Sequence, residues 1–168
     1  QKLFDDGKIG KTEEQLMTGI ISNSIQLITH HSSHFESGKN IIILSADSES
    51  SLISEAAGAA FRSQNWNVFS IGDMSSSIDV LFDLELRKLL SKTWKSKEGV
   101  MIILVFSQTE EGLKFISDSF YSVKEKSENN LFIVLSGKTG KKVKIKGDLS
   151  SPKLEDILQW SNTKYENL

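Results

Sequence analysis

Short apolar runs alternate with longer amphipathic stretches from Asn40 to the end of the chain, and this alternation is the strongest constraint on the fold. The runs are continuously apolar, whereas a strand with one face in water alternates apolar and polar residues. Continuous runs are typical of parallel strands that are covered by helices on both faces. The sequence therefore predicts four buried strands, at residues 40–45, 66–72, 100–106 and 131–136.

The stretches between and after these runs have helical periodicity. Alternation of strands with helices predicts an α/β fold with a flavodoxin-like five-stranded parallel doubly wound sheet. The alternating segment "KVKIK" at 142–146 is the candidate for the short fifth strand, and Pro152 is expected in the first turn of the last helix. The predicted helices are 51–64, 77–93, 110–126 and 151–165.

A separate helical segment precedes the predicted sheet. Thr12 can cap a helix whose first turn carries Glu13 and Glu14, and apolar residues then recur along positions 16–28. We expect this stripe to pack partly on the sheet and partly on absent or partner helices. The predicted organisation is a helical segment at 1–37, the remnant of a helical bundle, and an α/β domain at 38–168.

Composition excludes several classes of function. The 168-residue chain has no cysteine, which rules out disulfides and thiolate sites and suits a cytoplasmic protein. The formal net charge of −2 gives no overall attraction to nucleic acid or to a membrane surface, and the apolar runs are too short to cross a bilayer. Because the chain begins without Met, we interpret it as a fragment.

The loops at the carboxyl ends of the strands, where this fold binds ligands, carry little recognisable chemistry. The first loop, "SADSES" at 45–50, has no glycine and so matches neither a dinucleotide fingerprint nor a phosphate-binding P-loop. The third strand ends in "VFSQT" (105–109), without the aspartate that a phospho-acceptor needs. We therefore expect no catalytic residues and no enzyme activity.

Two polar clusters have a structural and a functional interpretation. His30 and His34, with Glu36 nearby, have a spacing that could hold a metal ion, but a polar helix end explains them equally simply, and we expect no metal site. The lysines of 138–146 could bind phosphate or nucleic acid. Alternation of lysine with Val143 and Ile145 favours protection of an edge strand instead.

Two segments resemble a known family. The first is "LFDDGKIGKTEEQLMTGIISNSIQLI" (3–28), with its G-x-I-x-x-x-E-E pattern, and the second is "GDLSSPKLEDILQW" (147–160). With the doubly wound pattern between them, they look like the cobalamin-binding sensory half of MerR-type transcription regulators, the light-sensing regulators of carotenoid genes. The resemblance implies a helical bundle above a flavodoxin-like cobalamin domain, preceded by a DNA-binding domain that is absent from this chain.

The family's cobalamin-binding positions can be carried over one by one. In its helical part, a tryptophan and a Glu-His pair correspond here to Phe4, Glu14 and Gln15, so the imidazole is lost. In its first sheet loop, D-x-H-x-x-G supplies the histidine that ligates cobalt. Without gaps that histidine falls on Ser50 and the glycine on Ile53, and a slip by one residue supplies neither. The later positions of the family correspond to Ser107, Ser136 and Gly137.

The resemblance implies a regulatory, sensory and oligomerising domain of a MerR-type regulator that does not bind cobalamin through the usual histidine. No cofactor is expected, the partner is a second copy of the chain, and DNA is reached only through the absent domain. Three alternatives stay open: a cobalamin sensor with unusual ligation, a corrinoid carrier for methyl transfer or small enzyme using Asp47 and Glu49, and an interaction module. A neutral imidazole is a good cobalt ligand and serine is a poor one. Because the histidine is lost, we rank the regulatory domain without cobalamin above the functions that bind it.

Overall fold

The structure is a computed structural model of the whole chain, and it describes residues 7, 10–29, 36, 38–75, 82–94, 98–124, 130–137 and 146–168. Five strands form one sheet in the order β2-β1-β3-β4-β5, and every neighbouring pair is parallel. This is the flavodoxin-like order that the sequence predicts. The strands are β1 (Lys39–Ser45), β2 (Asn67–Asp73), β3 (Val100–Ser107), β4 (Leu131–Gly137) and β5 (Leu149–Ser150).

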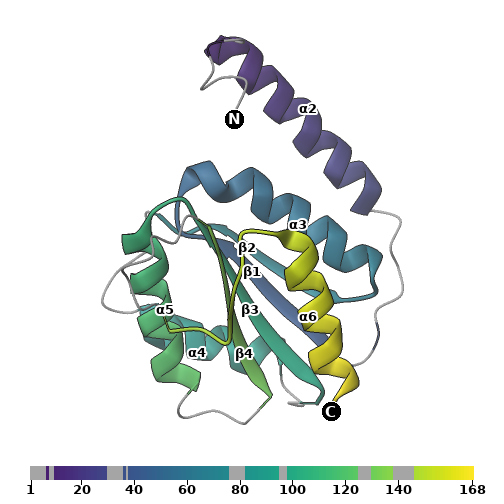
Figure 1. The fold of residues 1–168 in the computed structure, drawn as a ribbon, viewed down its shortest axis with the longest axis vertical. Coiled ribbons are helices and arrows are strands. Elements are labelled where there is room, and N and C mark those ends of the chain that lie inside the picture. The colour runs from purple at the N-terminus through teal and green to yellow at the C-terminus, as the bar shows by residue number, and fades with distance from the viewer. Residues whose placement is uncertain are drawn as a thin grey trace.

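Helices cover both faces of the sheet, as Figure 1 shows. Side chains alternate between the faces along each strand, so the core has two halves. Ile42 and Ile103 pack toward α4 and α5, whereas Ile41 and Ile102 pack toward α3 and α6. Every residue of the central strand β3 is buried, which explains why this strand is the most apolar run in the sequence. The helices are α3 (Ser51–Ser63), α4 (Phe82–Thr93), α5 (Glu110–Lys124) and α6 (Leu154–Glu166).

Trp66 joins α3, β2 and α6 at one end of the fold. The indole is fully buried, and its ring packs edge-on against Phe61 with the centroids 5.4 Å apart. Its Nε1 donates to Oδ1 of Asn162 on α6 at 3.0 Å, so the one polar atom of the side chain is satisfied. The tryptophan therefore belongs to the core.

Helix α2 (Lys11–Thr29) forms an additional outer layer, with α3 between it and the sheet (Figure 1). The hydroxyl of Ser22 donates to Oε2 of Glu55 on α3 at 2.6 Å. Small residues on α3, among them Ala56 and Ala59, allow the two helices to approach closely. Leu16 and Ile20 stay mostly exposed, so the stripe is only partly used within the chain.

Some predicted boundaries are wrong. Helix α2 starts at Lys11, so Thr12 lies inside the helix, and it is Glu13 whose carboxylate accepts the N–H of Gly10 at 2.8 Å. Pro152 precedes α6 rather than standing in its first turn, because α6 starts only at Leu154.

The fifth strand is also displaced from its predicted place, since β5 is the pair Leu149–Ser150. The predicted segment 142–146 lies outside the described residues except for Lys146, which is not in a strand. Asp148 explains the shift, because its backbone N–H donates to the carbonyl of Ile133 on β4 and its carboxylate accepts the N–H of the same residue. The chain thereby joins the edge of β4 just before Leu149.

No helix among the described residues is both long and apolar enough to span a membrane. The predicted histidine cluster at 30–34 lies outside the described part of the chain.

Candidate ligand site at the carboxyl end of the sheet

The carboxyl ends of β1 and β3 lie side by side at the point where the chain turns to opposite sides of the sheet. After β1 the chain crosses to β2, and later it returns to place β3 on the other flank of β1. Such a switch point opens a crevice between the two loops, and ligands of this fold bind there. In this protein the corresponding place lies between Ala46–Ser50 after β1 and Ser107–Thr109 after β3, and we use the word crevice for that place.

Asp47 ties the two loops together. One carboxylate oxygen, Oδ1, accepts the backbone N–H of Ser50 at 2.9 Å and so caps the short 3-10 turn Ser48–Ser50. The other, Oδ2, accepts the hydroxyl of Ser107 at 2.7 Å and the backbone N–H of Gln108 at 2.8 Å. Both oxygens of Asp47 are thus committed to contacts inside the crevice.

The protonation of Asp47 follows from these contacts. Burial is the largest single influence and raises the pKa of the carboxyl, but hydrogen bonding from the Ser107 hydroxyl, from Ser50 and from the backbone amide of Gln108 together outweighs it. The pKa of Asp47 therefore lies below its ordinary value of 3.8, and the group is ionised at neutral pH. The serine-rich loop at 45–50 thus holds a half-buried carboxylate, that of Asp47.

The single proton of the Ser107 hydroxyl is already donated to Asp47, so this hydroxyl cannot also donate to a ligand. It donates to Asp47 and accepts the backbone N–H of Thr109 at 3.1 Å, and the side chain is fully buried. Gly112, in the first turn of α5, lets the helix pack directly on this loop. A Cβ there would lie 2.8 Å from Oγ of Ser107.

Ser136 and Gly137 end β4, beside the end of β3. Ser136 is buried, and Gly137 pairs in register with Ser107 of β3. The backbone of Gly137 has φ +151°, and a Cβ on it would overlap the carbonyl group of Ser107. This glycine is therefore required by the close approach of β3 and β4.

Ser50 is fully buried, and its Oγ finds no hydrogen-bond partner among the described residues. As the N-cap of α3 it makes no side-chain cap bond either. The residue that stands at the predicted cobalt-ligand position therefore points into protein and is not presented at the surface. Ile53, at the predicted glycine position, is 43% exposed on α3.

The predicted positions of the helical segment are not gathered with those of the sheet. Glu14 is half-buried on α2 and Gln15 on the same helix is exposed, while Phe4 lies outside the described residues. Asp47 thus links Ser50 to Ser107, and Gly137 on β4 pairs in register with Ser107. Sequence analysis missed Asp47 as the link between the loops, although an aspartate directly before a short turn is a recognisable cap signal.

Asp47 and Glu49 do not form a cation site with their neighbours. Glu49 is exposed, and the described residues hold no group of three or more carboxylate or imidazole side chains that could bind a metal ion. General base catalysis by Asp47 is disfavoured too, because its lowered pKa makes it a weak base.

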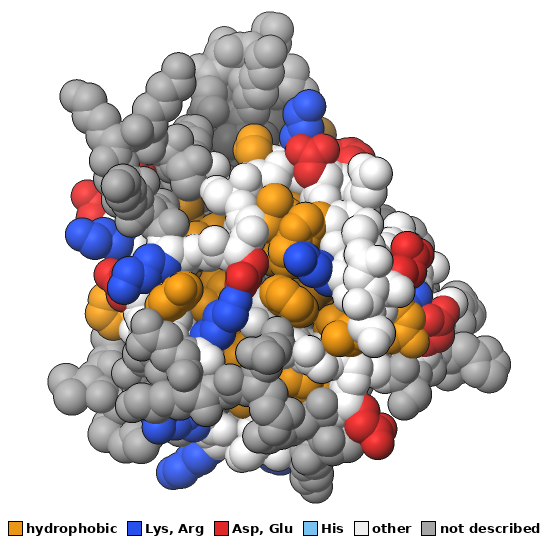
Figure 2. Space-filling model, turned by 60° about the horizontal axis from the view of Figure 1, so that its bottom comes forward, with side chains coloured by type: hydrophobic (Ala, Val, Ile, Leu, Met, Phe, Trp, Pro, Cys, Tyr) orange, Lys and Arg blue, Asp and Glu red, His pale blue; other side chains and the backbone are white. Residues whose placement is uncertain are grey.

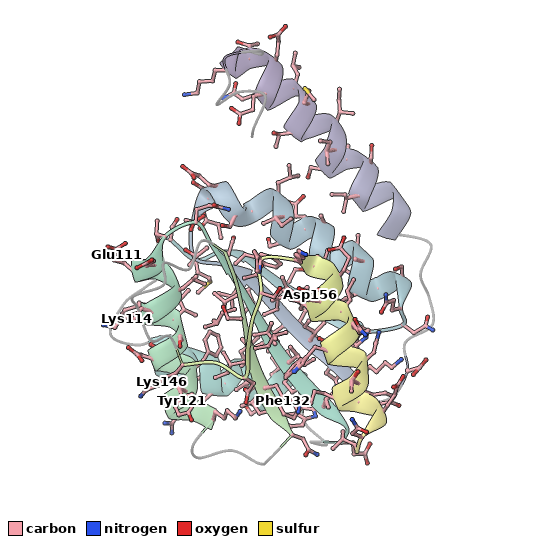
Figure 3. All side chains as sticks on the ribbon, viewed as in Figure 1. Glu111, Lys114, Tyr121, Phe132, Lys146 and Asp156 are labelled. Atoms are coloured by element: carbon pink, nitrogen blue, oxygen red, sulfur yellow. The ribbon has the colours of Figure 1, made fainter. Side chains whose placement is uncertain are left out.

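The opposite end of the sheet carries lysines that lie over aromatic rings. The ammonium of Lys164 stands 5.3 Å from the ring centres of both Phe132 and Trp160, and Lys146 stands 5.2 Å from that of Tyr121. Figure 3 labels Phe132, Tyr121 and Lys146 near this end, and Figure 2, turned to bring it forward, shows lysine and hydrophobic side chains intermixed. Lys124 is ion-paired with Asp148, so part of this charge is neutralised within the chain.

Comparison with known proteins gives a likeness of fold. No protein-family model matches the chain, and no curated protein matches it. Among solved structures, the monomethylamine corrinoid protein of Methanosarcina barkeri superposes with a TM-score of 0.64 over 99% of this chain and 76% of that chain. The two sequences are 12% identical, so the likeness is one of fold.

Proposed function

We propose that the chain is a regulatory, non-enzymatic domain of a MerR-type transcription regulator, which oligomerises and has the fold of a corrinoid-binding domain without the usual histidine ligation. The single observation that carries the proposal is the commitment of the crevice to internal contacts. Asp47 takes up the Ser107 hydroxyl and the Gln108 amide. The position that would ligate cobalt is the buried hydroxyl of Ser50.

The residues present do not fit a cobalamin bound in the family's manner. A cobalt ion prefers a neutral imidazole, and the three histidines of the chain are His30, His31 and His34, far from this loop in sequence. The tail-binding serine of the family corresponds to Ser107, whose hydroxyl is already engaged. Release of that hydroxyl would leave the ionised Asp47 short of a donor in a partly buried place, which is costly.

The regulatory assignment is supported by the segments that flank the sheet. The G-x-I-x-x-x-E-E pattern (7–14) runs into the first turn of α2, and the 147–160 segment contains β5 and the start of α6. Both resemble the sensory half of MerR-type regulators, and the solved structure with the same fold is a corrinoid protein. In the described loops after β1 and β3 we find no acid-base pair, since Asp47 is held ionised and Glu49 is exposed.

Retention of a chromophore tests the ligand part of the proposal. The purified chain is mixed with methylcobalamin or adenosylcobalamin in the dark and then desalted. We expect no cobalamin absorbance to stay with the protein. Stoichiometric retention would overturn the loss of ligand, and the regulatory part is tested separately by sequencing the gene upstream of Gln1, where a helix-turn-helix is expected.

A matched pair of variants sharpens the result. Asp47→Ala frees the Ser107 hydroxyl, and Glu49→Ala removes a carboxylate from the same loop without touching that network. If Asp47 alone closes the crevice, cobalamin is retained by Asp47→Ala only. If the missing imidazole also matters, as we expect, neither variant retains it.

A corrinoid carrier for methyl transfer is the second candidate, and the structural neighbour favours it because that protein is itself a corrinoid protein. Cobalamin could then bind with its own base as the lower ligand. The absorption spectrum distinguishes the two candidates, since a carrier of this kind retains cobalamin with the spectrum of the base-on form. Absence of any retained cobalamin excludes the carrier.

A further inference from the structure

The edge of the sheet at β4 and β5 carries a surface on which lysine side chains lie against aromatic rings. β5 pairs only with Val134 and Leu135, so among the described residues the first part of β4 has no neighbouring strand on that side. Phe132, in that first part, is consequently only partly buried. The lysines and aromatic residues around it come from α5, from the segment before β5 and from α6 (Figure 3). We call this set the lysine–aromatic face: Tyr121, Lys124, Phe132, Lys146, Trp160 and Lys164.

The ring of Phe132 is the centre of this face. Its centroid lies 5.5 Å from the ammonium of Lys124 and 5.3 Å from that of Lys164. Trp160 packs edge-on against the same ring, with the centroids 5.6 Å apart, and Lys164 also lies 5.3 Å from the Trp160 ring. The contacts with the rings hold these ammonium groups beside partly exposed aromatic surface.

The charge of the face is positive. Lys124 is ion-paired with Asp148, whereas the ion pairs of the described residues include neither Lys146 nor Lys164. Lys146 is exposed, and its ammonium lies 5.2 Å from the ring centre of Tyr121. Two ammonium groups therefore have no anionic partner within the described part of the chain. An ammonium has three N–H donors, so one that lies over a ring can still donate to an oxygen from outside.

We infer that the lysine–aromatic face binds an acidic segment of another protein, with carboxylates on Lys146 and Lys164 and an apolar side chain against Phe132. Charge complementarity selects carboxylates, since the chain as a whole has a net charge of −2 and attracts anions only where its lysines gather. The partly exposed rings select a segment that also carries an apolar residue, because a few aromatic residues supply much of the binding free energy of a protein interface. The inference goes beyond the proposed function and depends neither on the regulatory role nor on the loss of cobalamin.

A nucleic acid is the other polyanion that such a surface attracts, but the geometry favours a peptide. Proteins that bind single strands stack the bases on aromatic rings. In this protein two ammonium groups already lie over the Phe132 ring and one over the Trp160 ring. A base would have to displace them, whereas a carboxylate can pair with an ammonium that keeps its ring. Asp148 shows this arrangement within the chain, because it pairs with Lys124 while Lys124 stays over Phe132.

Fluorescence anisotropy of a labelled peptide tests the inference. The probe is a short fluorescein-labelled peptide of glutamates around two central leucines, added to the purified 168-residue chain at low salt. We expect saturable binding that weakens as salt is added, since exposed charges are screened. Lys164→Met removes the charge but keeps an aliphatic side chain beside the rings, and it should raise the Kd about tenfold. Lys164→Arg keeps both the charge and the contact with the rings, so it should bind like wild type.

A lysine on the other face of the sheet supplies the matched control. Lys88 is exposed on α4, which packs against the half of the core opposite to that of α6. Lys88→Met makes the same change of charge, and it should leave the Kd of the peptide unchanged. Lys146→Met should weaken binding as Lys164→Met does, and it replaces that variant if far-UV circular dichroism shows that Lys164→Met folds poorly.

Iodide quenching of tryptophan fluorescence locates the bound peptide. Trp66 and Trp94 are buried, with exposed fractions of 0% and 6%, whereas Trp160 is partly exposed. Trp160 is therefore the tryptophan that iodide reaches. Because iodide is an anion and lysines lie beside Trp160, it should quench more strongly than caesium does. Saturating peptide should protect Trp160 from this quenching.

Three results would overturn the inference. The first is a peptide that does not bind at low salt. The second is binding that Lys88→Met weakens as much as Lys164→Met does, or binding that leaves Trp160 unprotected, since either would show that the lysine–aromatic face is not the site. The third is tighter binding of an oligothymidine of equal charge, which would assign the face to nucleic acid. None of these results bears on the proposed function, which the retention of cobalamin and the upstream gene sequence test separately.

Discussion

The carboxyl end of the sheet and helix α2 differ in which side chains are paired within the chain and which are exposed to solvent. At the sheet, the polar groups of Asp47 and Ser107 turn inward and are paired with each other. On α2, the apolar side chains of Leu16 and Ile20 turn outward. The first region is where a protein of this fold normally meets a small ligand, and the second is an element added outside the α/β fold.

The two regions differ in the free energy that a binding partner would gain there. A crevice whose donors are consumed internally offers little to a ligand, because each new contact must replace an existing one. An exposed apolar stripe gains free energy from whatever covers it. Covering the exposed side chains of α2 would break no contact within the described chain, whereas a ligand between Asp47 and Ser107 would have to replace their hydrogen bond.

Gly137→Ala should have the largest effect on the closed region. The new methyl group would overlap the carbonyl of Ser107, and the positive φ disfavours alanine. We expect the free energy of unfolding to fall by about 3 kcal/mol, as for other backbone clashes in a packed place. Urea denaturation followed by tryptophan fluorescence measures this change.

Gly19→Ala is the matched control in the open region. No atom lies within 4 Å of the place where its Cβ would stand. Alanine is the better helix former by about 1 kcal/mol, so α2 should become slightly more stable. Equal losses in the two variants would show that the carboxyl end is not as closely packed as the contact of Gly137 with Ser107 indicates.

Asp47→Ala should destabilise the fold by about 2 kcal/mol. The change leaves the buried Ser107 hydroxyl and the Gln108 amide without their acceptor, and the turn at Ser50 loses its cap. Glu49→Ala, an exposed neighbour, is expected to change the stability by less than about 0.5 kcal/mol. A loss as small for Asp47→Ala would contradict its role as the link between β1 and β3.

Acid should weaken the same link. Because the folded-state pKa of Asp47 is lowered, its contribution is complete above the ordinary value of 3.8 and is lost as the pH falls through the folded-state pKa. The stability difference between wild type and Asp47→Asn should therefore be constant from pH 7 down to about pH 5 and shrink below about pH 4. Denaturation midpoints of both proteins in a pH series give this difference, and a gap that widens on acidification would reverse the assigned sign.

The strands were predictable from the sequence because burial on both faces leaves a continuous apolar run. Ile41, Ile42 and Ile43 alternate between the two halves of the core, yet all three are buried. A continuous apolar run in the sequence is therefore enough to identify a strand that is covered on both faces. The fifth strand was not predictable in the same way. Leu149–Ser150 is only two residues long, and its position depends on hydrogen bonds from Asp148 to β4 that no local pattern contains.

The candidate site was predictable in its location but not in its state. The strand order places the ends of β1 and β3 side by side, and there Asp47 links Ser50 to Ser107, while Gly137 pairs with Ser107 from β4. That Asp47 reaches across to Ser107, 60 residues later in the chain, is a tertiary contact. Sequence periodicity carries no information about such a pair. The sequence therefore showed a loop without recognisable chemistry, whereas in the structure its aspartate is hydrogen-bonded to the loop after β3.

The smallest expected effect concerns the contact between α2 and α3. Ser22→Ala removes the hydrogen bond to Glu55, which is partly exposed, and should cost about 0.5–1 kcal/mol. The loss should be local, since α2 lies outside both halves of the core. Hydrogen exchange is therefore the right measurement: amides of α2 should exchange faster in Ser22→Ala while those of β1 and β3 stay unchanged. If exchange in β3 rises equally, α2 unfolds together with the sheet, and the separation of the molecule into a closed α/β body and an outer helix has to be given up.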